Sequence, residues 1–201
     1  DIQYTPARAL LAARSVGLGR VLTVGNGYYP NTTEESARAE NTFLVAEAKK
    51  DPTRLAAAIA VLAPADWAVA EIRRSHGEGA RVLKLHPMAS GMDLRTVADQ
   101  ARLEVLLSEA ERLGMTVLIH GNYPGDAHAG EAAALVSVIA KHPDLRIIVA
   151  HALTREHALL PKLKGPHVFV DVSALPLFEF EAAQRAALVE SLRAFGMDHV
   201  L

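Results

Sequence analysis

The sequence predicts an α/β fold with a parallel sheet, in the form of a (β/α)₈ barrel that is incomplete at both ends of this chain. Two observations support this prediction. Short apolar runs alternate with helical segments along all 201 residues. Three of these runs contain no Gly or Pro and stop at a histidine, at His86, His120 and His151. Such runs are typical of buried parallel strands, whose carboxyl ends form the ligand-binding edge of α/β folds.

Each apolar run predicts a strand, and the segments between the runs predict helices. The expected strands are residues 20–24, 55–62, 81–85, 116–119, 146–149 and 167–172, and 199–201 is the expected start of another. The expected helices are 6–16, 33–50, 65–75, 94–113, 130–141, 157–163 and 179–195. Six complete strands, one incomplete strand and a helix before the first strand fit a barrel that lacks its first strand and is cut inside its last.

The ends of several helices have recognisable signals. Thr5 is a suitable N-cap and Pro6 a suitable first residue for the first helix, which Gly17 ends. The helix within residues 94–113 has leucines on one face and stops at Gly114. The alternative fold is an open doubly wound sheet, but no G-x-G-x-x-G or Walker loop follows any strand. We expect one domain over residues 1–201.

The composition excludes several classes of protein. The net charge is −2 and both signs are mixed along the chain, so a nucleic acid is not an expected partner. There are no cysteines, which excludes disulfides and thiolate metal sites. No apolar stretch is long enough to cross a membrane, and the first residues do not resemble a signal peptide. We therefore expect a soluble, cytoplasmic protein.

Two of the strand-end histidines are candidate metal ligands. His120 ends its strand at Gly121, where the backbone can turn away, and imidazole is a common ligand for zinc. His151 lies between two alanines that leave space, so it could be a second ligand or a general base. The alternative for each is a buried histidine held by hydrogen bonds.

Lys84 and His86 are two residues apart and project from the same face of their strand. A lysine in a buried strand needs a partner or a function, because an unpaired buried charge is costly. Lys84 could be a carbamylated ligand between two metals, a Schiff-base lysine, a substrate contact or an ion-pair partner. His86 could contact the substrate or orient a neighbour. Asp171 could pair with Lys84 or a histidine, or could cap the turn that contains Ser173.

Loops on the same edge offer further candidates. Residues 26–33 and 88–93 follow strands, and so does the loop with Asn122, Tyr123, Asp126 and His128, whose members are either substrate contacts or solvated. The remaining histidines lie on helices, loops or strand beginnings and are predicted to be structural: His76, His142, His157, His167 and His199.

Several segments resemble the amidohydrolase superfamily, specifically its amidohydrolase-2 branch of metal-dependent hydrolases and decarboxylases. They are residues 79–87, 114–120, 142–152, 168–173 and 195–201. The resemblance implies a (β/α)₈ barrel with a divalent metal at its mouth, often zinc and either one ion or two. It implies that His120 is a metal ligand and that His151 is either a ligand or a catalytic residue. Lys84 lies on the strand that carries a carbamylated lysine in some superfamily members.

The resemblance also implies a first-strand His-x-His upstream of Asp1 and an aspartate just past Leu201, so this chain by itself is expected to hold metal weakly or not at all. The predicted function is hydrolysis of a small amide, lactone or ester by a metal-activated water, with His151 assisting proton transfer. Alternatives are non-oxidative decarboxylation of an aromatic or unsaturated acid, Schiff-base chemistry at Lys84, and a non-catalytic barrel. The expected partners are a small-molecule substrate and further copies of the chain in a homo-oligomer.

Overall fold

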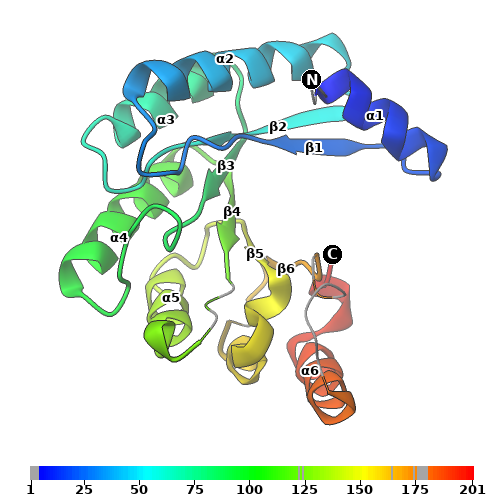
Figure 1. Cartoon of the computed structure of the whole chain (residues 1–201), viewed down its shortest axis with the longest axis vertical. Helices are drawn as coiled ribbons and strands as arrows, with labels where there is room; N and C mark the ends of the chain where they lie inside the picture. Colours follow the sequence, from blue (N-terminus) through cyan, green and yellow to red (C-terminus); the bar gives the residue numbers. More distant parts are fainter. Residues whose placement is uncertain (1–4, 122, 124, 164, 174, 176–180) are drawn as a thin grey trace.

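Six parallel strands form one curved sheet in the order of the sequence (Figure 1). The computed structural model describes residues 5–121, 123, 125–163, 165–173, 175 and 181–201. The strands are β1 (Val21–Val24), β2 (Leu55–Ala60), β3 (Val82–Leu85), β4 (Thr116–His120), β5 (Ile147–Ala150) and β6 (Val168–Val170). This sequential parallel order confirms the predicted α/β fold.

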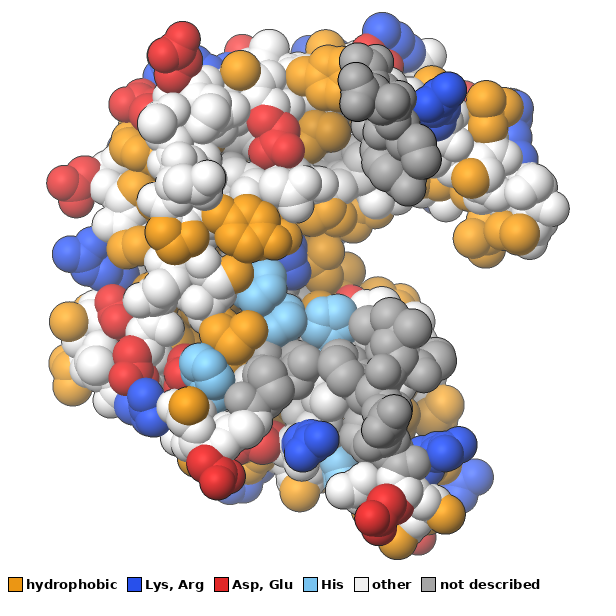
Figure 2. Space-filling view, viewed as in Figure 1, with side chains coloured by type: hydrophobic (Ala, Val, Ile, Leu, Met, Phe, Trp, Pro, Cys, Tyr) orange, Lys and Arg blue, Asp and Glu red, His pale blue; other side chains and the backbone are white. Residues whose placement is uncertain are grey.

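The helices alternate with the strands and lie along one side of the sheet, while the other side faces the hollow of a C-shaped molecule (Figures 1 and 2). They are α1 (Pro6–Ser15), α2 (Glu34–Lys50), α3 (Ala68–Gly77), α4 (Val97–Arg112), α5 (Glu131–Ile139) and α6 (Ala182–Phe195). The described residues also include the 3₁₀ segments η1 (Asp126–His128), η2 (His151–Leu163) and η4 (Met197–His199). No described helix is long and apolar enough to cross a membrane.

The sheet does not close into a full barrel within the described residues. β1 lies at one edge. At the other edge β6 pairs with β5 and, on its outer side, has a single parallel bridge from Val170 to Val200. Val200 thus lies where a seventh strand was predicted to start, although His199 belongs to η4. The prediction of an incomplete barrel is confirmed.

Side chains alternate between the two sides of each strand. Leu83 and Leu85 on β3, and Val117 and Ile119 on β4, face the helices and are fully buried in the core. The residues between them, such as Lys84, face the hollow. This alternation determines which side chains face the hollow and can contribute to a site at the carboxyl edge of the sheet.

β2 ends at Ala60 and not at residue 62 as predicted, because a side chain of α2 replaces the neighbouring strand there. Asn41 is fully buried, accepts a hydrogen bond from the Ala60 N–H at 3.0 Å and donates one to the Ala60 carbonyl at 3.0 Å. Its amide also donates to Glu71 Oε1 at 2.9 Å. Asn41 thus completes the hydrogen bonding at the carboxyl end of β2.

Replacement of Asn41 should destabilise the fold measurably. Asn41→Ala leaves the Ala60 backbone groups and Glu71 short of buried partners, and each such loss costs about 1–3 kcal/mol. We expect a loss of about 2–4 kcal/mol in the free energy of unfolding, measured by urea denaturation. The control is Thr42→Ala, which removes an exposed hydroxyl–Glu78 contact and should cost under about 0.5 kcal/mol. Equal losses in the two variants would contradict this account of the β2 end.

Candidate active site

The three strand-end histidines meet at the carboxyl edge of the sheet. The rings of His86 and His120 stack with centroids 3.7 Å apart and an interplanar angle of 14°. The rings of His120 and His151 meet edge to face at 5.0 Å and 71°. Histidine side chains accordingly gather in the hollow of the molecule (Figure 2). The structure thus assembles the histidines as the strand pattern predicts, and their chemical roles remain predictions.

The register of the sheet explains the stacked pair. Lys84 on β3 lies opposite Leu118 on β4. His86 and His120 each lie two residues further on, on the same side of their strands, so they face each other across the gap between the strands.

His151 reaches the site by a different route. His120 lies opposite Ala150, so alternation alone would direct His151 toward the helices, like Val149. His151 instead has a left-handed backbone with φ 63°, and the next three residues also have positive φ. This bend, which lies before the helix expected over residues 157–163, turns the imidazole into the hollow. A left-handed conformation costs a non-glycine residue about 1–2 kcal/mol.

Hydrogen bonds to the turn after β6 hold His151 in this position. Asp171 Oδ1 accepts from the His151 N–H at 3.0 Å and from the Ser173 N–H at 2.9 Å, and also contacts the Ser173 hydroxyl. His151 Nδ1 donates to the Ser173 carbonyl at 2.8 Å. Because a carbonyl only accepts, the proton lies on Nδ1, and Nε2 of the neutral ring keeps its lone pair. Asp171 therefore both caps the turn at Ser173 and fixes His151.

The two candidates at the carboxyl end of β3 are a buried base, Lys84, and a half-buried one, His86. The Lys84 side chain is 7% exposed, and burial lowers its pKa to about 8, against the opposing charge of Asp171. Burial lowers the pKa of His86 to about 4, and the nearby charges of Lys84 and His151 add to this effect. His86 Nδ1 accepts a hydrogen bond from the Ala89 N–H at 3.2 Å, so the neutral ring carries its proton on Nε2.

The loop after β4 differs from its prediction. Asn122 lies outside the described residues. Tyr123 is neither a solvated loop residue nor a free substrate contact, since it is 6% exposed in the core and its hydroxyl donates to the His120 carbonyl at 3.4 Å. Gly121 explains why: a Cβ there would lie 2.6 Å from Val149 Cγ1, so only glycine lets the chain turn inward. His128 Nδ1 lies 2.7 Å from Glu131, away from the three histidines.

One residue of the site was missed by sequence reasoning. The ring of Tyr28, from the loop between β1 and α2, lies 5.0 Å from that of His86. Burial raises the pKa of its hydroxyl to about 12. The sequence placed the loop on this edge, but nothing in it indicated that Tyr28 crosses β2 to reach β3.

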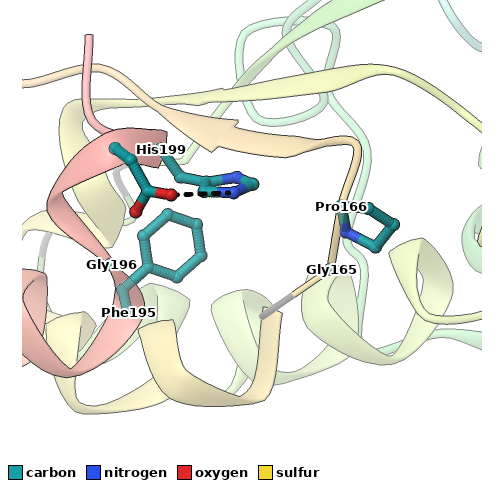
Figure 3. Close-up of a pocket in the computed structure, with 6 residues that line it drawn as sticks. Gly165, Pro166, Phe195, Gly196 and His199 are labelled. Atoms are coloured by element: carbon teal, nitrogen blue, oxygen red, sulfur yellow. Dashed lines mark ion pairs between the residues drawn. The ribbon is translucent and has the colours of Figure 1, made fainter.

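One cavity of the described residues lies away from this site. It has a volume of about 400 Å³ and is lined by residues such as Gly165, Pro166 and His199 (Figure 3). Gly165 and Pro166 precede β6, so this cavity lies at the amino edge, away from the edge that carries chemistry in barrels. His199 Nδ1 pairs with the Val168 carbonyl at 2.7 Å there, consistent with the structural role predicted for it.

The donor set fits a divalent cation in part. His120 and His151 bring two imidazoles together at 5.0 Å. His151 Nδ1 binds the Ser173 carbonyl, so Nε2 is the nitrogen that could bind a metal. An outer hydrogen-bond partner on the other ring nitrogen is usual for metal-bound histidine. Within the described residues, no group of three or more His, Asp or Glu side chains is arranged to hold a metal ion.

Comparison with known proteins identifies the family. A family model described as amidohydrolase, of the amidohydrolase-2 type, matches residues 3–201. The chain belongs to the amidohydrolase family. The predicted resemblance is thereby confirmed over nearly the whole sequence.

Individual relatives of this amidohydrolase are more distant. A dihydroorotase from Aliivibrio fischeri is 28% identical over 165 residues, which are 78% of this chain and 48% of that protein. The chain thus spans about half the length of the curated relatives it matches.

Solved structures share the fold. A TIM-barrel protein from Bordetella bronchiseptica superposes with a TM-score of 0.68 and 18% identity, over 98% of this chain and 68% of that one. A 5-carboxyvanillate decarboxylase from Novosphingobium aromaticivorans with bound manganese superposes with a TM-score of 0.66 and 16% identity, over 100% of this chain and 70% of that one. At these identities the likeness establishes the barrel fold alone.

The buried amine of Lys84 predicts a specific pH dependence of stability. Between pH 8 and 10.5 the folded protein holds Lys84 neutral while the unfolded chain still binds the proton, so the free energy of unfolding rises with pH there. Relative to Lys84→Met, the wild type should gain on the order of 2–3 kcal/mol between pH 7 and 10.5, measured by urea denaturation. The exposed Lys141→Met variant is the control and should track the wild type. If the free energies of unfolding of the wild type and Lys84→Met change with pH in the same way, the Lys84 amine is not buried as a cation.

Proposed function

We propose that this amidohydrolase is a metal-dependent hydrolase of a small amide, lactone or ester, with its catalytic centre at His120 and His151. The main support is the 5.0 Å contact between these two imidazoles at the carboxyl edge of the sheet. The family, whose description is that of a hydrolase, agrees with this proposal.

His120 and His151 would hold the cation, and zinc is the proposed ion, although the decarboxylase relative contains manganese. A divalent cation bound there supplies Lewis acidity, which polarises a substrate carbonyl and makes a bound water a nucleophile at neutral pH. If only one ion is held, mainly by His120, the unprotonated Nε2 of the neutral His151 ring can accept or return a proton.

Lys84 and His86 are the proposed substrate contacts. Below pH 8 the Lys84 amine is a buried cation facing the hollow, which suits a substrate carboxylate. His86 keeps its proton on Nε2 and can donate it in a hydrogen bond to a substrate oxygen. Asn122 follows the same strand edge and remains a proposed contact.

Lys84 also favours a second candidate, the non-oxidative decarboxylation of an aromatic or unsaturated acid. A buried cation beside three imidazoles would bind such an acid as readily as a carboxylated lactone. The two reactions share the same residues and differ in product, since only decarboxylation releases CO₂.

The first test is metal content. The natural protein, purified without chelator, should contain one or two zinc, manganese or iron ions per chain by elemental analysis. His120→Ala and His151→Ala should lower that content, and His120→Ala should lower kcat/KM at least about 100-fold, since loss of a metal ligand removes several kcal/mol of transition-state stabilisation. A panel of amides, lactones and aromatic acids, with CO₂ detection, separates the two reactions.

The matched control is His76→Ala, which removes a histidine on α3, distant from the strand-end histidines. It should leave metal content and activity unchanged. A protein that is free of metal and takes up none from excess zinc would overturn the proposed function.

A further inference from the structure

His86 contacts two other rings. It stacks on His120 with centroids 3.7 Å apart and an interplanar angle of 14°, and it meets Tyr28 in a tilted contact at 5.0 Å and 33°. These three rings, which we call the ring stack, run from the loop after β1 to the end of β4.

The turn after β3 fixes two members of the ring stack. The Ala89 N–H donates to His86 Nδ1 at 3.2 Å and so sets the rotation of that imidazole. One residue later, the Ser90 hydroxyl donates to the Tyr28 carbonyl at 2.9 Å. Ser90 is 3% exposed, so this bond between two loops is shielded from water.

Tyr28 reaches His86 because its loop passes closely over the end of β2. A Cβ at Gly27 would lie 2.9 Å from the Ala60 carbonyl oxygen, a distance that side chains do not tolerate. The loop is also tied to α2, since the Asn26 N–H donates to Glu40 Oε2 at 2.9 Å. Glycine at position 27 therefore allows a residue of β1's loop to contact a residue of β3.

We infer that Tyr28 and His86 are positioning residues, which fix the ring plane of His120 through the ring stack before a cation binds. The terminal torsion of a histidine side chain is otherwise broad, and a ligand must be held close to its productive orientation for tight binding. This inference rests on the proposed function in one respect, namely that His120 is a metal ligand. In this role Tyr28 and His86 act through His120 and do not touch the cation.

Zinc titration of the natural protein against a chromophoric chelator tests the inference with the metal alone. His86→Ala should weaken Zn²⁺ binding by about 10- to 100-fold, the usual effect of losing a partner that orients a ligand. Two further variants separate stacking from hydrogen bonding. His86→Phe keeps a flat ring and should retain most of the affinity, whereas His86→Asn keeps an acceptor for Ala89 and should not.

The loop variants test the other end of the ring stack. Tyr28→Leu should weaken Zn²⁺ binding several-fold, and Phe43→Leu, the same kind of change at a half-exposed ring on α2, should have no effect. Gly27→Ala should act like Tyr28→Leu because it lifts the loop from Ala60. Gly19→Ala is its control, since nothing lies within 4 Å of a Cβ there.

The outcomes separate the two proposals. If His120→Ala abolishes Zn²⁺ binding while His86→Ala and Tyr28→Leu stay within twofold of the wild type, the ring stack does not position His120 and the proposed function stands. If the natural protein binds no Zn²⁺, the proposed function fails, and ring resonances of the metal-free protein decide the inference. Long-range ¹H–¹⁵N spectra should then show His86 protonated on Nε2, and Tyr28→Leu should shift or broaden the His120 ring signals. Unchanged His120 signals would overturn the inference.

Discussion

Lys84 lies opposite Leu118 across the ladder between β3 and β4, and the candidate site depends on this register. A slip of one residue would turn His86 or His120 toward the helices and remove one ring from the hollow. The register is secured by the other side of the same strands, where Leu83, Leu85, Val117 and Ile119 are buried without exposure in the core. Packing of apolar side chains on the helix side thus specifies which polar side chains meet on the other.

The site gathers several nitrogen bases but few positive charges. Burial and the neighbouring Lys84 and His151 lower the pKa of His86 to about 4, so this ring is neutral at physiological pH. Lys84 keeps its charge below pH 8 because Asp171 partly offsets the cost of burial. The same carboxylate binds the His151 N–H and the turn at Ser173. Asp171 therefore links the electrostatics of β3 to the geometry of β5 and β6.

Much of the fold and part of the site could be predicted from the sequence. Strand order, the approach of His86 to His120 and the distant position of His199 follow from apolar runs and their carboxyl ends. The approach of His151 was predicted from its place at a strand end, but its cause was not, since it depends on left-handed residues at 151–154, where the sequence has no glycine. Tyr28 was missed because its contact with His86 is between two loops distant in sequence. Tyr123 was misplaced because a polar loop gives no sign that one ring turns into the core.

The two candidate ligands are supported by strands and loops that lie in opposite directions along the sheet. His151 is fixed by hydrogen bonds to Asp171 and Ser173, which belong to the turn after β6. His120 is fixed by the ring stack, whose members come from β3 and from the loop after β1. The two supports meet where the two imidazoles approach each other, at 5.0 Å. A parallel sheet brings such separately held groups to one edge because all its strands end there, so the geometry of the centre can be tuned by loops that never touch the reacting atoms.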